Sequence, residues 1–281
     1  MFQGGSVSNH PQDDLQTNIA LIRKLQAGPR WLDDIVRHGR EAVPALRALL
    51  FAREPSGLSQ ARCRAAQALA ALKAFDVLEE FLTCDRFIGD PVEQLGEDIV
   101  LSTAASLIAQ RGDDATFDLL MRLAGQKHLR GIIEGLGTFQ RPESIPVLID
   151  ALAHDELRQA AETALRDLIH FARKDLVNVA GRRNGGGQSE SESSLRQRRS
   201  ALALLRDLRV SRQEWSHLRV LLYDPDRQIS VLACQIGMKV GVLEERAWAR
   251  AHLESLKAEA SWLECFQIDQ VLNHESSRWA A

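Results

Sequence analysis

Three stretches of the sequence repeat one pattern, and this repetition limits the possible folds more than any other feature. They are residues 42–69, 144–165 and 217–237. Each predicts an apolar helix, a short polar turn and a second helix that is rich in small residues. One such helix pair cannot bury its apolar surface alone, so the repetition predicts helix pairs that stack in series.

The stretch 144–165 shows the pattern best. Its first helix carries Ile145, Leu148 and Leu152 at the spacing that places apolar side chains on one helix face. Its second helix is rich in alanine, with Ala160, Ala161 and Ala164. Small residues let neighbouring helices approach closely, while larger side chains fill the space between them.

The polar turns carry aspartates that can cap the second helices. Asp155 and Asp226 lie at two of these turns, and Asp90 stands before Pro91 at another predicted helix start. A carboxylate there accepts hydrogen bonds from the free N–H groups of the first turn. Proline suits the first helical position, where its missing N–H would have no partner inside the helix.

The composition favours helices over the whole chain. Aromatic residues are only 5% of the 281 residues, and leucine and alanine dominate the apolar 45%. These two residues lead the helix-propensity scale, whereas aromatic and β-branched residues favour strands. The remaining predicted helices are 7–27, 30–38, 75–83, 91–110, 113–124, 127–136, 195–209, 211–223, 225–240, 243–257 and 259–274.

The repeated units resemble the HEAT-repeat family. The resemblance rests on the early proline of the first helix, at Pro44 and Pro146, on the aspartate turns and on the small-residue second helices. It is best at 142–170, good at 41–73 and 215–238, and weak between 75 and 137. The resemblance implies an all-α fold, namely a right-handed α-α superhelix of antiparallel helix pairs. It indicates an architecture and does not indicate an activity.

One segment interrupts the helical pattern. Residues 181–194 contain three consecutive glycines and alternating serine and glutamate, which cannot bury apolar area and predict a flexible loop. The expected organisation is a disordered tail at 1–15, HEAT-like repeats at 16–180, the loop at 181–194, and further HEAT-like repeats with a helical cap at 195–281.

The cysteines indicate a cytoplasmic protein, and the net charge bears on its partners. Cys63, Cys84, Cys234 and Cys265 form no C-x-x-C pair, and Cys63 and Cys234 sit in helical patterns where a free thiol serves as a small core residue. The formal net charge of -3 favours neither nucleic acid nor an anionic membrane. No apolar run is long enough to span a bilayer, so no membrane partner is expected.

The sequence predicts no catalytic residues, no metal site and no cofactor. The motifs of phosphate-binding loops and serine hydrolases are missing, and one His-Glu pair, His274-Glu275, cannot build a two-metal centre. Gly135, Gly137 and Gly237 are interpreted as helix C-caps rather than phosphate cradles.

We therefore expect a non-catalytic scaffold or adaptor that binds another protein. In the family that the chain resembles, the second helices line the concave side, so their outward polar residues would form the contact surface. An amphipathic helix or a folded protein suits a surface of mixed charge. The predicted partner-binding residues are Arg62, Glu97, Lys127, Arg130, Arg158, Glu162 and Arg166.

Arginines around the Gly-rich loop form a second candidate surface, for an anionic partner. Paired arginines bind phosphates and carboxylates, and this alternative would make the chain a nucleic-acid-binding module. Two HEAT-like enzyme classes also stay open, the alkyl-purine DNA glycosylases and the tetrapyrrole lyases and isomerases. The loop arginines are Arg182, Arg183, Arg196, Arg198 and Arg199.

Overall fold

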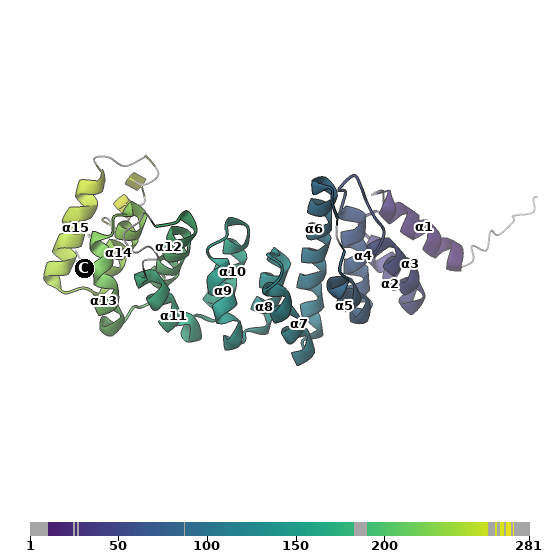
Figure 1. Cartoon of the computed structure of the whole chain (residues 1–281), viewed down its shortest axis with the longest axis horizontal. Helices are drawn as coiled ribbons and strands as arrows, with labels where there is room; N and C mark the ends of the chain where they lie inside the picture. The colour runs from purple at the N-terminus through teal and green to yellow at the C-terminus, as the bar shows by residue number, and fades with distance from the viewer. Residues whose placement is uncertain are drawn as a thin grey trace, which may run out of the picture. The chain divides into compact units, whose positions relative to one another are not determined.

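The computed structural model of the chain divides into two units, Met1–Phe139 and Gln140–Ala281. It describes residues 11–24, 26, 28–86, 88–182, 190–257, 262, 265–266, 268–270 and 272. Every regular element among these residues is a helix (Figure 1). The predicted all-α class is confirmed, and each unit is described below by itself.

The first unit contains eight α-helices and two short 3-10 turns among its described residues. They are α1 (Pro11–Arg23), α2 (Trp31–Val36), η1 (Gly39–Ala42), α3 (Val43–Leu50), α4 (Gln60–Ala71), α5 (Phe75–Thr83), α6 (Pro91–Ile108), η2 (Ala109–Arg111), α7 (Asp114–Ala124) and α8 (Arg130–Phe139). Helix α1 begins inside the segment expected to be a disordered tail, and Leu15 on it is buried. Residues 1–10 lie outside the described part.

Neighbouring helices of the first unit pack in pairs, α3 with α4, α5 with α6 and α7 with α8. The second members also pack on one another, α4 on α6 and α6 on α8. These second helices carry the small residues, which permit the close contact. Gly131 on α8 donates its N–H to the Ser102 hydroxyl of α6 at 2.7 Å, and a Cβ at Gly131 would lie 1.6 Å from the Ser102 carbonyl oxygen.

The second unit repeats this arrangement. Its elements are η3 (Pro142–Ser144), α9 (Ile145–Ala151), α10 (Asp155–Asp167), α11 (Ile169–Gly181), α12 (Glu192–Arg206), α13 (Arg212–Leu218), η4 (Arg219–Tyr223), α14 (Arg227–Val240) and α15 (Leu243–Lys257). The pairs are α9 with α10, α11 with α12 and α13 with α14, and the second helices α10, α12 and α14 pack in sequence. Helix α15 covers α14.

Two of the three predicted aspartate caps are confirmed. Asp90 accepts hydrogen bonds from the N–H groups of Val92 and Glu93, each at 2.9 Å, and Asp226 accepts one from Ile229 at 2.9 Å. The prediction for Asp155 is wrong, because His154 holds the N-cap position and Asp155 is the first residue of α10.

The prediction of glycine C-caps is also wrong. Gly135 and Gly137 lie inside α8, which ends at Phe139, and Gly237 lies inside α14. Gly237 serves packing, since a Cβ there would meet the Trp215 ring at 2.8 Å, and a Cβ at Gly135 would lie 3.0 Å from the Ala105 carbonyl oxygen. Local sequence suggested helix ends, but the requirement for glycine comes from a neighbouring element.

The expected loop at 181–194 is shorter in the structure. Helix α11 continues to Gly181 and α12 begins at Glu192, while residues 183–189 lie outside the described part. The prediction of helices at 75–83 and 243–257 is confirmed by α5 and α15. Of the helix expected at 259–274, only part is described.

Candidate functional site

Two residues expected on the partner-binding surface lie in the interior of the first unit. Arg62 of α4 is 4% exposed and Glu97 of α6 is 2% exposed. Arg62 donates from Nη1 to Glu97 at 2.6 Å and from Nε to the Leu50 carbonyl at 2.8 Å, and Arg86 reaches the same carboxylate at 3.2 Å. Their assignment to an outward surface is therefore wrong, because the long side chain turns inward to the end of helix α3.

Arg198 of the second unit has an equivalent role. Its side chain on α12 is 1% exposed and donates to the Ala180 carbonyl at the end of α11 at 3.0 Å. Its two other nitrogens bind Glu190 at 2.6 Å and Asp224 at 2.5 Å. In both units an arginine of a second helix thus joins the end of its first helix to an acid of another segment.

The neighbouring arginines also have partners within the protein. Arg196 binds Asp155 at 3.2 Å, and Arg199 binds Asp226 through two nitrogens at 3.1 and 2.5 Å. Arg182 is exposed at the end of α11, and Arg183 lies outside the described part. The structure therefore uses Arg196, Arg198 and Arg199 to hold segments of the second unit together, which the prediction of an anion-binding set missed.

The remaining predicted contact residues are more accessible. Lys127 and Arg130 belong to the first unit, where Arg130 pairs with Glu134 at 2.7 Å. Arg158, Glu162 and Arg166 follow one another at four-residue intervals on a single face of α10. Glu162 is half-buried and accepts a hydrogen bond from Ser200 of α12 at 2.8 Å.

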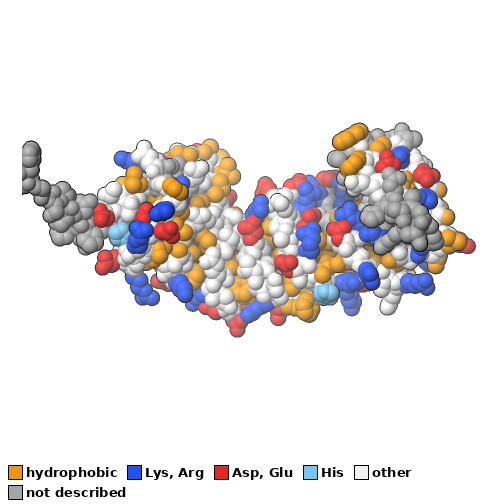
Figure 2. Space-filling view, turned by 180° about the vertical axis from the view of Figure 1, so that it is seen from behind, with side chains coloured by type: hydrophobic (Ala, Val, Ile, Leu, Met, Phe, Trp, Pro, Cys, Tyr) orange, Lys and Arg blue, Asp and Glu red, His pale blue; other side chains and the backbone are white. Residues whose placement is uncertain are grey.

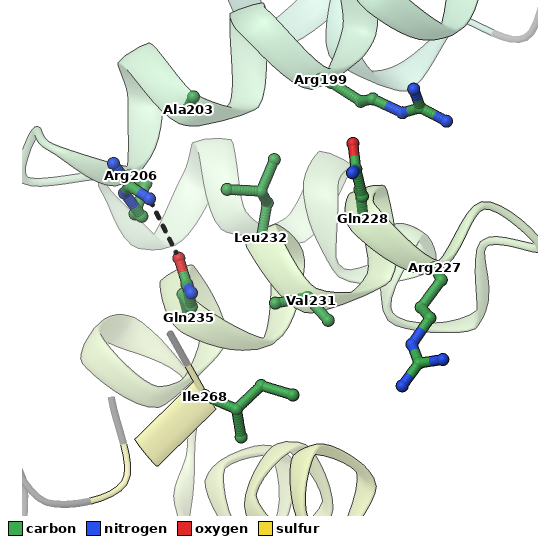
Figure 3. Close-up of a pocket in the computed structure, with 9 residues that line it drawn as sticks. All are labelled: Arg199, Ala203, Arg206, Arg227, Gln228, Val231, Leu232, Gln235 and Ile268. Atoms are coloured by element: carbon green, nitrogen blue, oxygen red, sulfur yellow. Dashed lines mark hydrogen bonds between the residues drawn. The ribbon is translucent and has the colours of Figure 1, made fainter. Parts of the chain in front are cut away.

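A pocket of about 290 Å³ lies between the second helices α12 and α14. No sequence pattern predicted this pocket, because its two main walls lie about thirty residues apart and each has the pattern of an ordinary amphipathic helix. Its lining residues are Arg199, Ala203 and Arg206 from α12, Arg227, Gln228, Val231, Leu232 and Gln235 from α14, and Ile268 (Figure 3).

The pocket combines an apolar centre with a basic rim. Figure 3 shows Leu232, Val231 and Ile268 in the middle, with three arginines around them. On α12, Arg199, Ala203 and Arg206 follow the i, i+4, i+7 spacing of one helix face. The small side chain of Ala203 leaves room opposite Leu232, so the gap between the helices is not filled.

The three arginines of the rim differ in how they are held. Arg199 is neutralised by Asp226, whose hydrogen bonds raise the pKa of the Arg199 guanidinium. Burial acts to raise the pKa of Asp226, but bonds from Arg199 and the Ile229 N–H outweigh it and lower the pKa below its usual value. Arg227 donates to the Leu256 carbonyl.

Arg206 is the most available of these charges. It binds the exposed Asp207 at 2.9 Å and the amide oxygen of Gln235 at 3.4 Å across the pocket (Figure 3). Its side chain is 36% exposed. No carboxylate is among the described residues that line the pocket, although Asp226 and Asp207 pair with two of the rim arginines from outside it.

A second apolar surface lies on the first unit. Val92, Leu95 and Ile99 of α6 are exposed at i, i+3 and i+7 spacing, and Leu58 is exposed in the segment before α4. In Figure 2, basic and acidic side chains are interspersed over the face that is seen, and hydrophobic side chains lie among them. Helix α6, a second helix of the first unit, thus presents apolar side chains to solvent.

A serine and a histidine of the second unit lie in contact, as in a nucleophilic pair, but the serine hydroxyl also bonds to a backbone carbonyl. The buried Ser230 hydroxyl donates to the Leu222 carbonyl at 2.9 Å and contacts His252 Nε2 at 3.0 Å. Burial lowers the pKa of His252. The nearby Cys234 is buried as predicted, and burial raises the pKa of its thiol to about 12, which keeps it protonated.

Cys63, the other thiol expected in the core, is half-buried, and its sulfur accepts a hydrogen bond from Thr103 at 3.4 Å. Trp215 is buried and donates to Glu245 at 2.8 Å. Among the described residues, potential metal ligands do not gather in groups of three or more, and His274 and Glu275 lie outside this part.

No protein-family model matches the chain, and no curated protein sequence matches it. Within the described part, no helix has the length and apolarity to cross a bilayer. The geometry of the site therefore carries the functional argument.

Proposed function

We propose that the chain is a non-catalytic scaffold of the HEAT-repeat type, a family whose antiparallel helix pairs form a right-handed α-α superhelix. Its role would be to bind another protein through the exposed surface of its second helices. Each helix pair of such a protein contacts mainly its neighbours, and binding surfaces extend along one layer of helices. The four free cysteines support a cytoplasmic location, where thiols stay reduced.

The arrangement of the second helices supports the repeat assignment. In each unit they pack in sequence, and Arg62 and Arg198 make corresponding bonds to the ends of their first helices. A recurring contact at recurring positions is expected of a chain built from one structural unit.

The observation that carries the proposal is the pocket between α12 and α14. It opens on two successive second helices, and its apolar centre is bordered by arginine and glutamine side chains. A surface that combines apolar anchors with surrounding polar donors is typical of protein interfaces, where arginine is enriched.

Site-specific photocrosslinking tests the proposal. A photoreactive amino acid is placed at Gln228, an exposed residue of the pocket, and in a matched protein at Lys174, which is exposed on the first helix α11. In the native cell we expect a discrete crosslinked protein from position 228 and none of that mass from position 174. Equal crosslinking at both positions, or none at position 228, would show that the second helices are not the binding surface.

A further inference from the structure

The pocket between α12 and α14 has features that identify the chemistry of what it binds, and the inference rests on the proposed function. Its volume of about 290 Å³ lies at the lower edge of the range of about 300–1,000 Å³ for small-molecule and cofactor sites. A space of this size suits one or two side chains of a protein segment better than a large planar pigment.

The apolar centre of the pocket favours an aliphatic side chain in the ligand. Leu232 and Val231 of α14 and the buried Ile268 face the space left open by Ala203 (Figure 3). Burial of an aliphatic side chain against them would remove apolar surface from water, which is the main favourable contribution in protein association. A leucine, isoleucine or valine side chain fits this position.

The arginines at the rim of the pocket favour a carboxylate in the ligand. The described lining holds three arginines and no carboxylate. Arg199 is already bound in a two-nitrogen pair with Asp226, whereas Arg206 is held by the exposed Asp207 and by a long 3.4 Å bond to Gln235. A carboxylate from a ligand could therefore bind Arg206 without breaking a buried ion pair.

We propose that this pocket binds an acidic, aliphatic segment of the partner protein. An aliphatic side chain enters between Ala203 and Leu232, and a neighbouring aspartate or glutamate binds Arg206. Gln235 becomes free to donate or accept at the segment's backbone once the guanidinium turns to the carboxylate. Charge-assisted bonds from arginine to carboxylate are the stronger kind of hydrogen bond and give geometric specificity.

Selection from a random twelve-residue peptide library against the full chain tests this inference. We expect the selected peptides to be enriched in aspartate and glutamate beside leucine, isoleucine or valine. Binding of a labelled selected peptide should weaken on the order of tenfold or more in Arg206→Glu, and it should weaken as added salt screens the charges.

Matched variants separate charge from packing. Arg219→Glu makes the same charge change at an exposed residue of η4 and should leave peptide affinity unchanged. Ala203→Leu fills the pocket without a charge change and should abolish binding, while Arg206→Gln should give an intermediate loss. Far-UV circular dichroism checks that each variant keeps its helices.

Several results would overturn the inference. They are selection of basic peptides, failure to select any peptide, affinity that is equal in Arg206→Glu and Arg219→Glu, or preferential binding of a twelve-nucleotide single-stranded DNA at the same residues. If any of these results is found while the photoreactive residue at 228 still captures a protein, the scaffold function stands and only the proposed ligand chemistry is wrong. If position 228 captures nothing, the scaffold function fails whatever the peptides do.

Discussion

At the scale of single residues, buried arginines join successive helix pairs. Arg198 is the clearest case, because it binds Glu190, Asp224 and the Ala180 carbonyl from a position that is 1% exposed. Arg198→Met would leave two poorly exposed carboxylates without their main cation. We expect a loss of about 3–5 kcal/mol in the free energy of unfolding, measured by urea denaturation.

Arg47→Met is the matched control for this prediction. Arg47 pairs with Glu80 on the surface of the first unit, where both side chains are about half exposed. Exposed ion pairs contribute little to stability because water and salt screen them. An equally large loss in Arg47→Met would show that burial does not distinguish the two arginines.

The same scale carries a prediction about pH. Hydrogen bonds from Arg173, aided by Ser211, lower the pKa of Glu214 to about 2 from 4.5, against the opposing effect of burial. A lowered folded-state pKa means that the contribution of Glu214 to stability is complete above pH 4.5 and is lost as the pH falls toward 2.

Glu214→Gln should therefore flatten the loss of stability between pH 4.5 and 2, and it should cost stability at neutral pH. Urea denaturation at a series of pH values measures both effects. Asp118→Asn, at an exposed position of α7, is the control. The assignment is wrong if Glu214→Gln keeps the pH dependence of the natural chain.

At the scale of helices, the distance between α6 and α8 depends on Gly131. A Cβ there would lie 1.6 Å from the Ser102 carbonyl oxygen, so the two helices must separate in Gly131→Ala. We expect a loss of about 1–3 kcal/mol, the usual cost of overpacking, although alanine is the better helix former. Gly125→Ala is the control because its Cβ would make an ordinary contact of 3.6 Å with the Arg122 carbonyl oxygen.

Equilibrium unfolding in urea measures both glycine variants, and far-UV circular dichroism reports the helix content of each. A stabilised Gly131→Ala would mean that α6 and α8 can move apart at no cost. In that case the small residues of the second helices would not set the spacing between helix pairs.

At the scale of the whole molecule, most packing contacts join helices that are near one another in sequence. Where helices contact mainly their neighbours in this way, we expect stability to be set by each helix pair and the pairs next to it. Arg198→Met should therefore raise amide hydrogen exchange in α11, α12 and α14 while leaving protection in α4 and α6 unchanged. Exchange that rises equally in both units would show a single cooperative block, which hydrogen exchange with mass spectrometry distinguishes.

The sequence by itself determined most of the helices and several of their ends, but it did not predict α11 at Ile169–Gly181. Helical spacing of leucine and alanine is a local property, so it predicted α5 and α15 and the all-helical class. Asp90 and Asp226 were likewise predictable as caps, because a capping carboxylate acts on N–H groups only two or three residues away.

Only the tertiary structure decided which polar residues face the solvent. Arg62 meets Glu97 thirty-five residues along the chain, and Arg198 meets Asp224 after twenty-six, so the spacing within one helix holds no record of either partner. The pocket arises in the same way, since Ala203 and Leu232 face each other only when α12 packs on α14. A helix face is set by its own period, but whether it is covered depends on a distant helix.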